Sequence, residues 1–95
     1  MASVTPQRVA FEAARVLVTI AGTELCWWVF GEVSRCLGTP WETRLMETRL
    51  RLLREDAYYR EAGCWRVLLE EEIREHPDVS DCLYRIVRSA APLLD

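Results

Sequence analysis

With 95 residues, the chain has room for one domain, which we expect to cover residues 1–95. Its composition of 51% hydrophobic and 28% charged residues is typical of a globular protein and excludes a disordered one. The net charge of −3 gives no general attraction to phosphate backbones or acidic lipid headgroups, so we expect neither nucleic acid nor a membrane as partner.

The first predicted helix begins at Thr5-Pro6, because Thr is a favoured N-cap and Pro is favoured at the first helical position. It extends to Ala21, where Gly22 interrupts the pattern. Polar residues form only a narrow stripe along this helix, which predicts that it lies at the centre of a bundle. The stripe consists of Arg8, Glu12, Arg15 and Thr19.

The second predicted helix restarts at Thr23 and runs to about Leu37, with Gly38 as its left-handed C-terminal residue. Trp27 and Trp28 fall at the two borders of its polar sector, so this helix alone cannot bury both indoles. We take Trp28 as a candidate partner-binding residue, because Trp is enriched in binding hot spots. The alternative is that a neighbouring helix covers Trp28.

The next region opens with a capping box, in which Thr39 is the N-cap, Pro40 the first helical residue and Glu42 the third. Its apolar residues form two stripes displaced by more than a quarter turn. A single straight helix would expose one stripe or press charged residues against the core. We therefore predict a short helix at 40–46 that bends into a second helix at 47–56. The stripes are Trp41, Leu45 and Leu52, and Met46, Leu50 and Leu53.

The remaining sequence predicts a connector at 56–60, a helix over about 61–75 and a last helix that starts at Pro77-Asp78 and stops at Pro92. No stretch alternates apolar and polar residues as a strand would. The expected fold class is therefore all-α: a compact antiparallel bundle of five to six short helices.

The four cysteines have neither a C-x-x-C spacing nor a zinc-binding pattern. Cys26, Cys64 and Cys82 fall on or beside apolar helix faces, where we expect buried reduced thiols that suit a reducing compartment. The apolar stretch at 16–30 is too short to span a bilayer, and the first fifteen residues do not resemble a secretory leader. We expect a soluble, cytoplasmic protein.

No pattern predicts an enzyme, a cofactor or a metal site. His76, the only histidine, precedes Pro77 at a helix junction, which is typical of a turn residue. The run Glu70-Glu71-Glu72 does not pair carboxylates, because consecutive helical residues point about 100° apart. We therefore expect no catalytic residue.

The charges are unevenly distributed. Residues 39–60 contain five Arg and four acidic residues, whereas residues 61–95 contain four Arg and eight acidic residues. Two unlike patches on one subunit permit head-to-tail contact, which closes into rings or grows as a helix. The alternative is an ordinary solvated surface, in which Arg51 pairs with Glu47 and Glu55. The candidate partner-binding charges are Arg44, Arg51 and Arg54 on one side and Glu70, Glu71, Asp78 and Asp81 on the other.

The last 40 or so residues, less than half of the chain, resemble the closing helices of the death-fold superfamily, and most of all the caspase recruitment domain (CARD). The residues that carry this resemblance are Leu52-Leu53, the run Gly63-Cys64-Trp65-Arg66-Val67-Leu68-Leu69, and His76-Pro77-Asp78-Val79 through Leu83. The resemblance implies a six-helix Greek-key bundle that binds like domains through oppositely charged patches. It also implies that the arginine set of one domain contacts the acidic set of another.

As a lone domain, the chain is similar to CARD-only regulators, which large DNA viruses such as ranaviruses also encode. The resemblance implies regulation, most simply inhibition, of apoptotic or innate-immune signalling through a death-fold partner such as a caspase or an adaptor. A helical homodimer that acts as an adaptor or small chaperone, with Trp27 and Trp28 at its seam, is an alternative. A nucleic-acid binder that uses the Arg side chains is a third, and the acidic C-terminal half argues against it.

Overall fold

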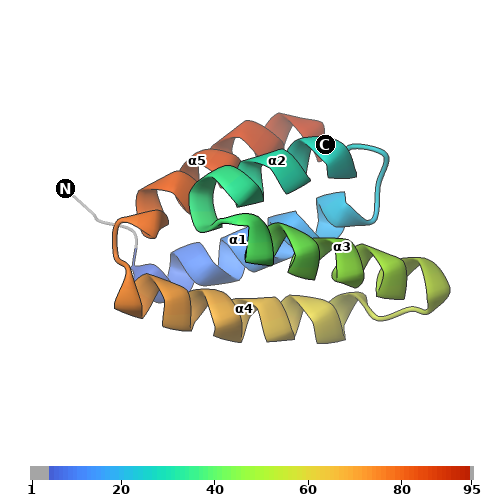
Figure 1. The fold of residues 1–95 in the computed structure, drawn as a ribbon, viewed down its shortest axis with the longest axis horizontal. Coiled ribbons are helices and arrows are strands. Elements are labelled where there is room, and N and C mark those ends of the chain that lie inside the picture. Colours follow the sequence, from blue (N-terminus) through green and yellow to red (C-terminus); the bar gives the residue numbers. More distant parts are fainter. Residues whose placement is uncertain (1–4, 95) are drawn as a thin grey trace.

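The computed structural model describes residues 5–94, which form five α-helices and one short 3₁₀-helix. No strand is present among these residues, so the prediction of an all-α bundle is confirmed. Figure 1 shows the helices running side by side and joined by short turns. They are α1 (Pro6–Ala21), α2 (Cys26–Leu37), α3 (Thr39–Arg54), α4 (Tyr58–Glu75), α5 (Val79–Ala90) and the 3₁₀-helix η1 (Ala91–Leu93).

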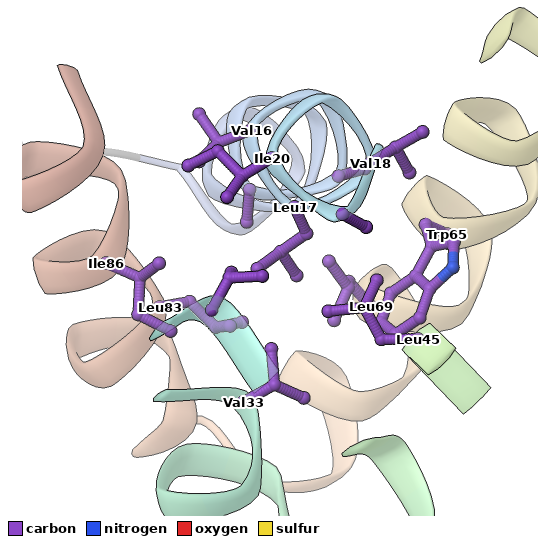
Figure 2. Close-up of a cluster of buried hydrophobic side chains, with 14 of the residues drawn as sticks. Val16, Leu17, Val18, Ile20, Val33, Leu45, Trp65, Leu69, Leu83 and Ile86 are labelled. Atoms are coloured by element: carbon purple, nitrogen blue, oxygen red, sulfur yellow. The ribbon is translucent and has the colours of Figure 1, made fainter. Parts of the chain in front are cut away.

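Helix α1 is the centre of the bundle and contacts each of the other four α-helices. Figure 2 views it end-on, with Ile86 of α5 on one side of its axis, Trp65 of α4 on the other and Val33 of α2 beneath. Its narrow polar stripe leaves nine residues of this helix buried, and Leu17 and Ile20 are fully so. The predicted central position of the first helix is confirmed.

Both predicted ends of α1 are also confirmed. Thr5 is the N-cap, and its hydroxyl accepts a hydrogen bond of 3.2 Å from the Arg8 backbone N–H. Gly22 is the C-cap. In the turn that follows, the Thr23 hydroxyl donates to the carbonyl of Ile20 at 2.7 Å, so that α2 begins at Cys26, three residues later than predicted.

Helix α3 is a single piece, and the predicted bend between 40–46 and 47–56 is wrong. Instead, the straight helix buries part of one apolar stripe and exposes the other: Leu45 is buried, whereas Leu50 and Leu53 are exposed. Arg49, which lies between the stripes, avoids the core by donating from Nη1 to two backbone carbonyls at the end of α1 and in the following turn. A bend is therefore not needed to keep this charge out of the core.

The starts of α3, α4 and α5 also differ from the prediction. Helix α3 begins at Thr39 itself, with Gly38 as the N-cap at a φ of 105° and no side-chain capping bond, so the capping box does not form. Helix α4 begins at Tyr58, so it includes most of the connector that was predicted at 56–60. Helix α5 begins at Val79, because Pro77 belongs to the preceding turn.

The cysteines correct the expectation of reduced buried thiols. Cys36 of α2 and Cys82 of α5 form a disulfide whose Cα atoms are 5.7 Å apart. Cys26 is free and buried as expected, whereas Cys64 is free and exposed. The pairing depends on α2 lying beside α5, a long-range contact that spacing along the chain does not specify.

None of the helices within residues 5–94 combines the length and the apolar composition that a bilayer crossing requires.

Candidate protein-binding surfaces

An exposed apolar region lies where α2 and α3 meet. Met46, Leu50 and Leu53 follow one face of α3 at helical spacing, and Trp27 of α2 lines the same groove as Met46 and Leu50. We call these four residues the Trp27 surface. Their exposed fractions are large for apolar side chains: Trp27 73%, Met46 39%, Leu50 59% and Leu53 60%.

The Trp27 indole is held in place by its neighbours. It packs edge-to-face on Phe30, with ring centroids 5.7 Å apart and an angle of 86° between the ring planes. Phe30 is itself buried in the core. The groove beside the indole has a volume of about 180 Å³. This is below the roughly 300–1,000 Å³ of typical small-molecule sites.

Trp28, the predicted partner-binding aromatic, is half-buried and packs against the core. Trp27 is the indole that faces solvent. Both lie at the borders of the polar sector of α2, as the sequence predicted. Which of the two is covered depends on the neighbours of α2, because Trp27 flanks the α3 side and Trp28 does not line that groove.

A second concave surface lies between α1 and α4, and we call it the α1–α4 groove. Its volume is about 330 Å³. Phe11 and Tyr59 are its most exposed rings, at 52% and 88%. A Cβ added at Gly63 would meet no atom within 4 Å, so the glycine leaves open space there. The lining residues are Phe11, Arg15, Tyr58, Tyr59, Ala62, Gly63 and Arg66.

The two arginines of the α1–α4 groove form only weak ion pairs with residues of their own chain. Arg15 lies 3.3 Å from a carboxylate oxygen of Glu12, and its side chain is 54% exposed. Arg66 lies 3.9 Å from Glu70 and is 51% exposed. Such surface ion pairs contribute about 0–1 kcal/mol each. Both guanidinium groups therefore remain available to a carboxylate or an aromatic ring of a partner.

A polar network joins α3 to α4 behind these surfaces. The Arg51 guanidinium donates two hydrogen bonds of 2.9 Å to Glu61, from Nε to Oε2 and from Nη2 to Oε1. Thr48, fully buried, donates to Glu61 Oε1 at 3.3 Å and accepts from the Trp65 indole N–H at 2.9 Å. No buried side-chain N or O atom among residues 5–94 lacks a partner.

This network fixes the charge state of Glu61. Hydrogen bonds from Arg51 hold the pKa of the Glu61 carboxyl below its ordinary value of 4.5, although burial acts in the opposite direction. The same contacts raise the pKa of Arg51. Both groups are therefore ionised at neutral pH and neutralise each other.

Arg51 is consequently not the free surface charge that the sequence suggested. Its partner is Glu61, and the predicted pairs with Glu47 and Glu55 do not form. Glu55 instead pairs with Arg60. The sequence pattern did not single out Glu61, although it contains one signal: Glu61 lies four residues before Trp65 on the buried side of α4, where a carboxylate needs a partner.

The other candidate charges are spread over the molecule. Arg44 stacks on Trp41, with its guanidinium carbon 4.9 Å from the ring centroid, and Arg54 makes no ion pair with any described residue. Figure 1 places the α3–α4 turn and the α4–α5 turn at opposite ends of the long axis. The structure therefore keeps Arg54 apart from the acidic residues of the α4–α5 turn.

The predicted acidic residues gather around that turn. Glu71, Asp78 and Asp81 are exposed and form no ion pair with a described residue. Asp78 is the N-cap of α5, and Asp81 lies in its first turn, where a negative charge complements the helix dipole. Glu70 is half-buried beside Arg66. Within residues 5–94, no cluster of three or more His, Cys, Asp or Glu residues has the geometry of a metal site.

Comparison with known proteins adds no relative: no protein-family model, no curated protein and no solved structure matches the chain.

Proposed function

We propose that this protein is a protein–protein interaction module that binds a like helical domain. In line with the CARD resemblance, its association regulates, and most simply inhibits, apoptotic or innate-immune signalling in the cytoplasm through a death-fold partner. The observation that carries the proposal is the Trp27 surface. Its apolar side chains lie on the outside of the bundle and are not part of the buried core.

Exposed apolar residues that gather on one surface mark protein-interaction sites in soluble proteins. Trp is also the residue type most enriched among the few side chains that dominate binding energy. Here an oriented indole, 73% exposed, stands beside Met46 and Leu50. Burying these side chains against a partner supplies about 25 cal/mol for each Å² of apolar surface removed from water.

The α1–α4 groove has the properties of a counterpart to Trp27. Its volume is about 330 Å³, and aromatic rings of α1 and α4 line it. Arg15 and Arg66 flank it, and a guanidinium over an indole is a favourable cation–π contact. On the subunit that contributes Trp27, Glu24 is exposed three residues before the indole, and its carboxylate is available to these arginines of the neighbouring subunit.

The two surfaces use different helices of one subunit, α2 and α3 for the Trp27 surface and α1 and α4 for the groove. A contact between them is therefore heterologous, and it leaves one free surface of each kind for the next subunit. The two charge sets are also accessible to a partner: Arg44 and Arg54 are exposed on α3, and Asp78 and Asp81 are exposed around the α4–α5 turn. Arg51 leaves this set because Glu61 neutralises it.

Light scattering against protein concentration tests the proposal. We expect the average mass of the natural chain to grow with concentration, and Trp27→Ala to remain a monomer. Tyr84→Ala is the matched control, because Tyr84 is an exposed aromatic on α5, outside both surfaces. A pulldown with a panel of purified CARDs then identifies the partner. Association of Trp27→Ala that equals that of the natural chain, in both assays, would refute the proposal.

A closed homodimer that serves as an adaptor or small chaperone is the second candidate function. One observation favours it: among the described residues, Arg49 is the only charged one that lines the groove of the Trp27 surface, and its Nη1 already donates to two backbone carbonyls. Two such surfaces therefore meet without strong like-charge repulsion. A dimer of fixed mass that does not respond to salt supports this candidate, whereas growth that weakens as salt is added supports the heterologous contact.

A further inference from the structure

The disulfide between Cys36 and Cys82 ties together two helix ends. Cys36 is the second-last residue of α2, and Cys82 lies in the first turn and a half of α5. The two residues are 46 positions apart in sequence. Both are half-buried rather than sealed in the core, so a small thiol reaches them more readily than it reaches Cys26.

A positive charge lies beside the disulfide, and its hydrogen bond goes to one of the two sulfur atoms. The Arg35 guanidinium donates from Nη1 to Cys82 Sγ at 3.8 Å. From Nη2 it also donates to Glu32 at 2.9 Å, which holds the guanidinium in position. A cation beside a sulfur favours its thiolate, and a thiol whose thiolate is favoured is the better leaving group in disulfide exchange.

We propose that Cys36–Cys82 is a reversible redox clasp in which Arg35 makes Cys82 the leaving thiolate. A thiolate of an external dithiol, of the kind that thioredoxin carries, attacks Cys36 Sγ. The S–S bond breaks, and its electron pair goes to Cys82 Sγ beside Arg35. The second thiol of the reductant then displaces Cys36. The reductant becomes a disulfide, and the protein gains two electrons and two protons.

The fold keeps its shape when the clasp opens. Leu83 and Ile86 are buried in the core and hold α5 in place without the disulfide. Reduction therefore frees the first turn of α5, which carries Asp81, from the end of α2. The effect of reduction on partner binding rests on the proposed function, whereas the redox step itself does not.

Alkylation in dithiothreitol buffers of increasing reducing strength, followed by mass measurement, tests the clasp on the folded chain. We expect Cys64 to react before any reductant is added, and Cys36 and Cys82 to become reactive together in one step. Buried Cys26 serves as the internal control, because it reacts only when the protein unfolds. If Cys36 and Cys82 react without reductant, or only together with Cys26, the proposal is wrong.

Arg35→Gln tests the role of the cation. We expect dithiothreitol to reduce this variant about threefold more slowly, and Arg35→Lys to restore most of the rate. Arg74→Gln is the matched control, since Arg74 lies in α4 and lines a different surface with Pro6 and Gln7. The pKa of the Cys82 thiol, followed by thiolate absorbance in a C36S/C64S variant, should rise in Arg35→Gln. An unchanged rate and an unchanged pKa would overturn the assignment of Cys82 as the leaving thiolate.

Discussion

Glu61 connects two helices through one side chain. It is only 5% exposed, and its carboxylate receives hydrogen bonds from Arg51 and Thr48 of α3. A buried carboxylate without such partners would cost several kcal/mol, so α3 and α4 are stable side by side only when these bonds form. Glu61 therefore contributes to the placement of α3, on which most of the Trp27 surface lies.

Removing the Glu61 carboxylate should therefore destabilise the fold. We expect Glu61→Ala to lower the free energy of unfolding by about 2–4 kcal/mol, because it leaves Thr48 and Arg51 without their acceptor. Urea denaturation followed by circular dichroism measures this change. Glu55→Ala is the control: its side chain is 52% exposed in a surface pair, and we expect a change within about 0.5 kcal/mol. Equal effects of the two substitutions would contradict this role of Glu61.

The same carboxylate should make stability depend on pH. Its folded-state pKa lies below the ordinary 4.5, so its contribution is fully present above that pH and is lost as the pH falls through the folded pKa. We expect the melting temperature of the natural chain to fall below about pH 4.5. Glu61→Gln should lose less stability over the same range. If the melting temperatures of the two proteins fall by the same amount between neutral and acidic pH, Glu61 is not the source of the acid sensitivity.

Helix α3 shows what local sequence can and cannot predict. Its two out-of-phase stripes were visible in the sequence, as was the consequence that a straight helix exposes one of them. The choice between a bend and a straight helix depends on contacts between distant residues. Arg49 reaches the end of α1, and Arg51 reaches Glu61, and neither contact follows from helical periodicity.

The two stripes of α3 should respond differently to substitution. Leu45 is fully buried, so Leu45→Ala should cost about 2–5 kcal/mol in unfolding free energy. Leu50 is 59% exposed, so Leu50→Gln should change stability by no more than about 0.5 kcal/mol. Association measured by light scattering should nevertheless weaken in Leu50→Gln. If Leu50→Gln destabilises the monomer as Leu45→Ala does, the second stripe belongs to the core.

Gly63 of α4 provides a test of whether the α1–α4 groove is open. Gly63 lies inside this helix, and a Cβ there would meet nothing within 4 Å. Gly63→Ala should therefore raise the unfolding free energy of the monomer by about 1 kcal/mol, because glycine is costly inside a helix. Gly38→Ala is the contrasting variant, since its φ of 105° makes any side chain unfavourable. A loss of stability in Gly63→Ala would show that the α1–α4 groove is not open.

For the whole molecule, the order and type of the helices followed from caps, prolines and apolar periodicity, because these are local signals. The central position of α1 followed from its narrow polar stripe. The candidate surfaces were predicted only in part. The sequence placed Trp27 and Trp28 at the edge of a polar sector, but only the packing of α2 against its neighbours decides which indole is exposed. The Arg51–Glu61 pair and the Cys36–Cys82 disulfide likewise depend on tertiary contacts.

In the association that we propose, the Trp27 surface of one subunit binds the α1–α4 groove of another. An equimolar mixture of Trp27→Ala and Gly63→Phe isolates this contact, because the first variant keeps only the groove and the second keeps only the indole. A Cβ at Gly63 would meet no atom within 4 Å, and the backbone there is ordinary helix, so we expect the Phe ring to occupy the groove and to leave α4 in place. We predict that each variant alone is a monomer and that the mixture forms a one-to-one dimer by light scattering. A mixture that stays monomeric, or a single variant that associates like the natural chain, would contradict the claim.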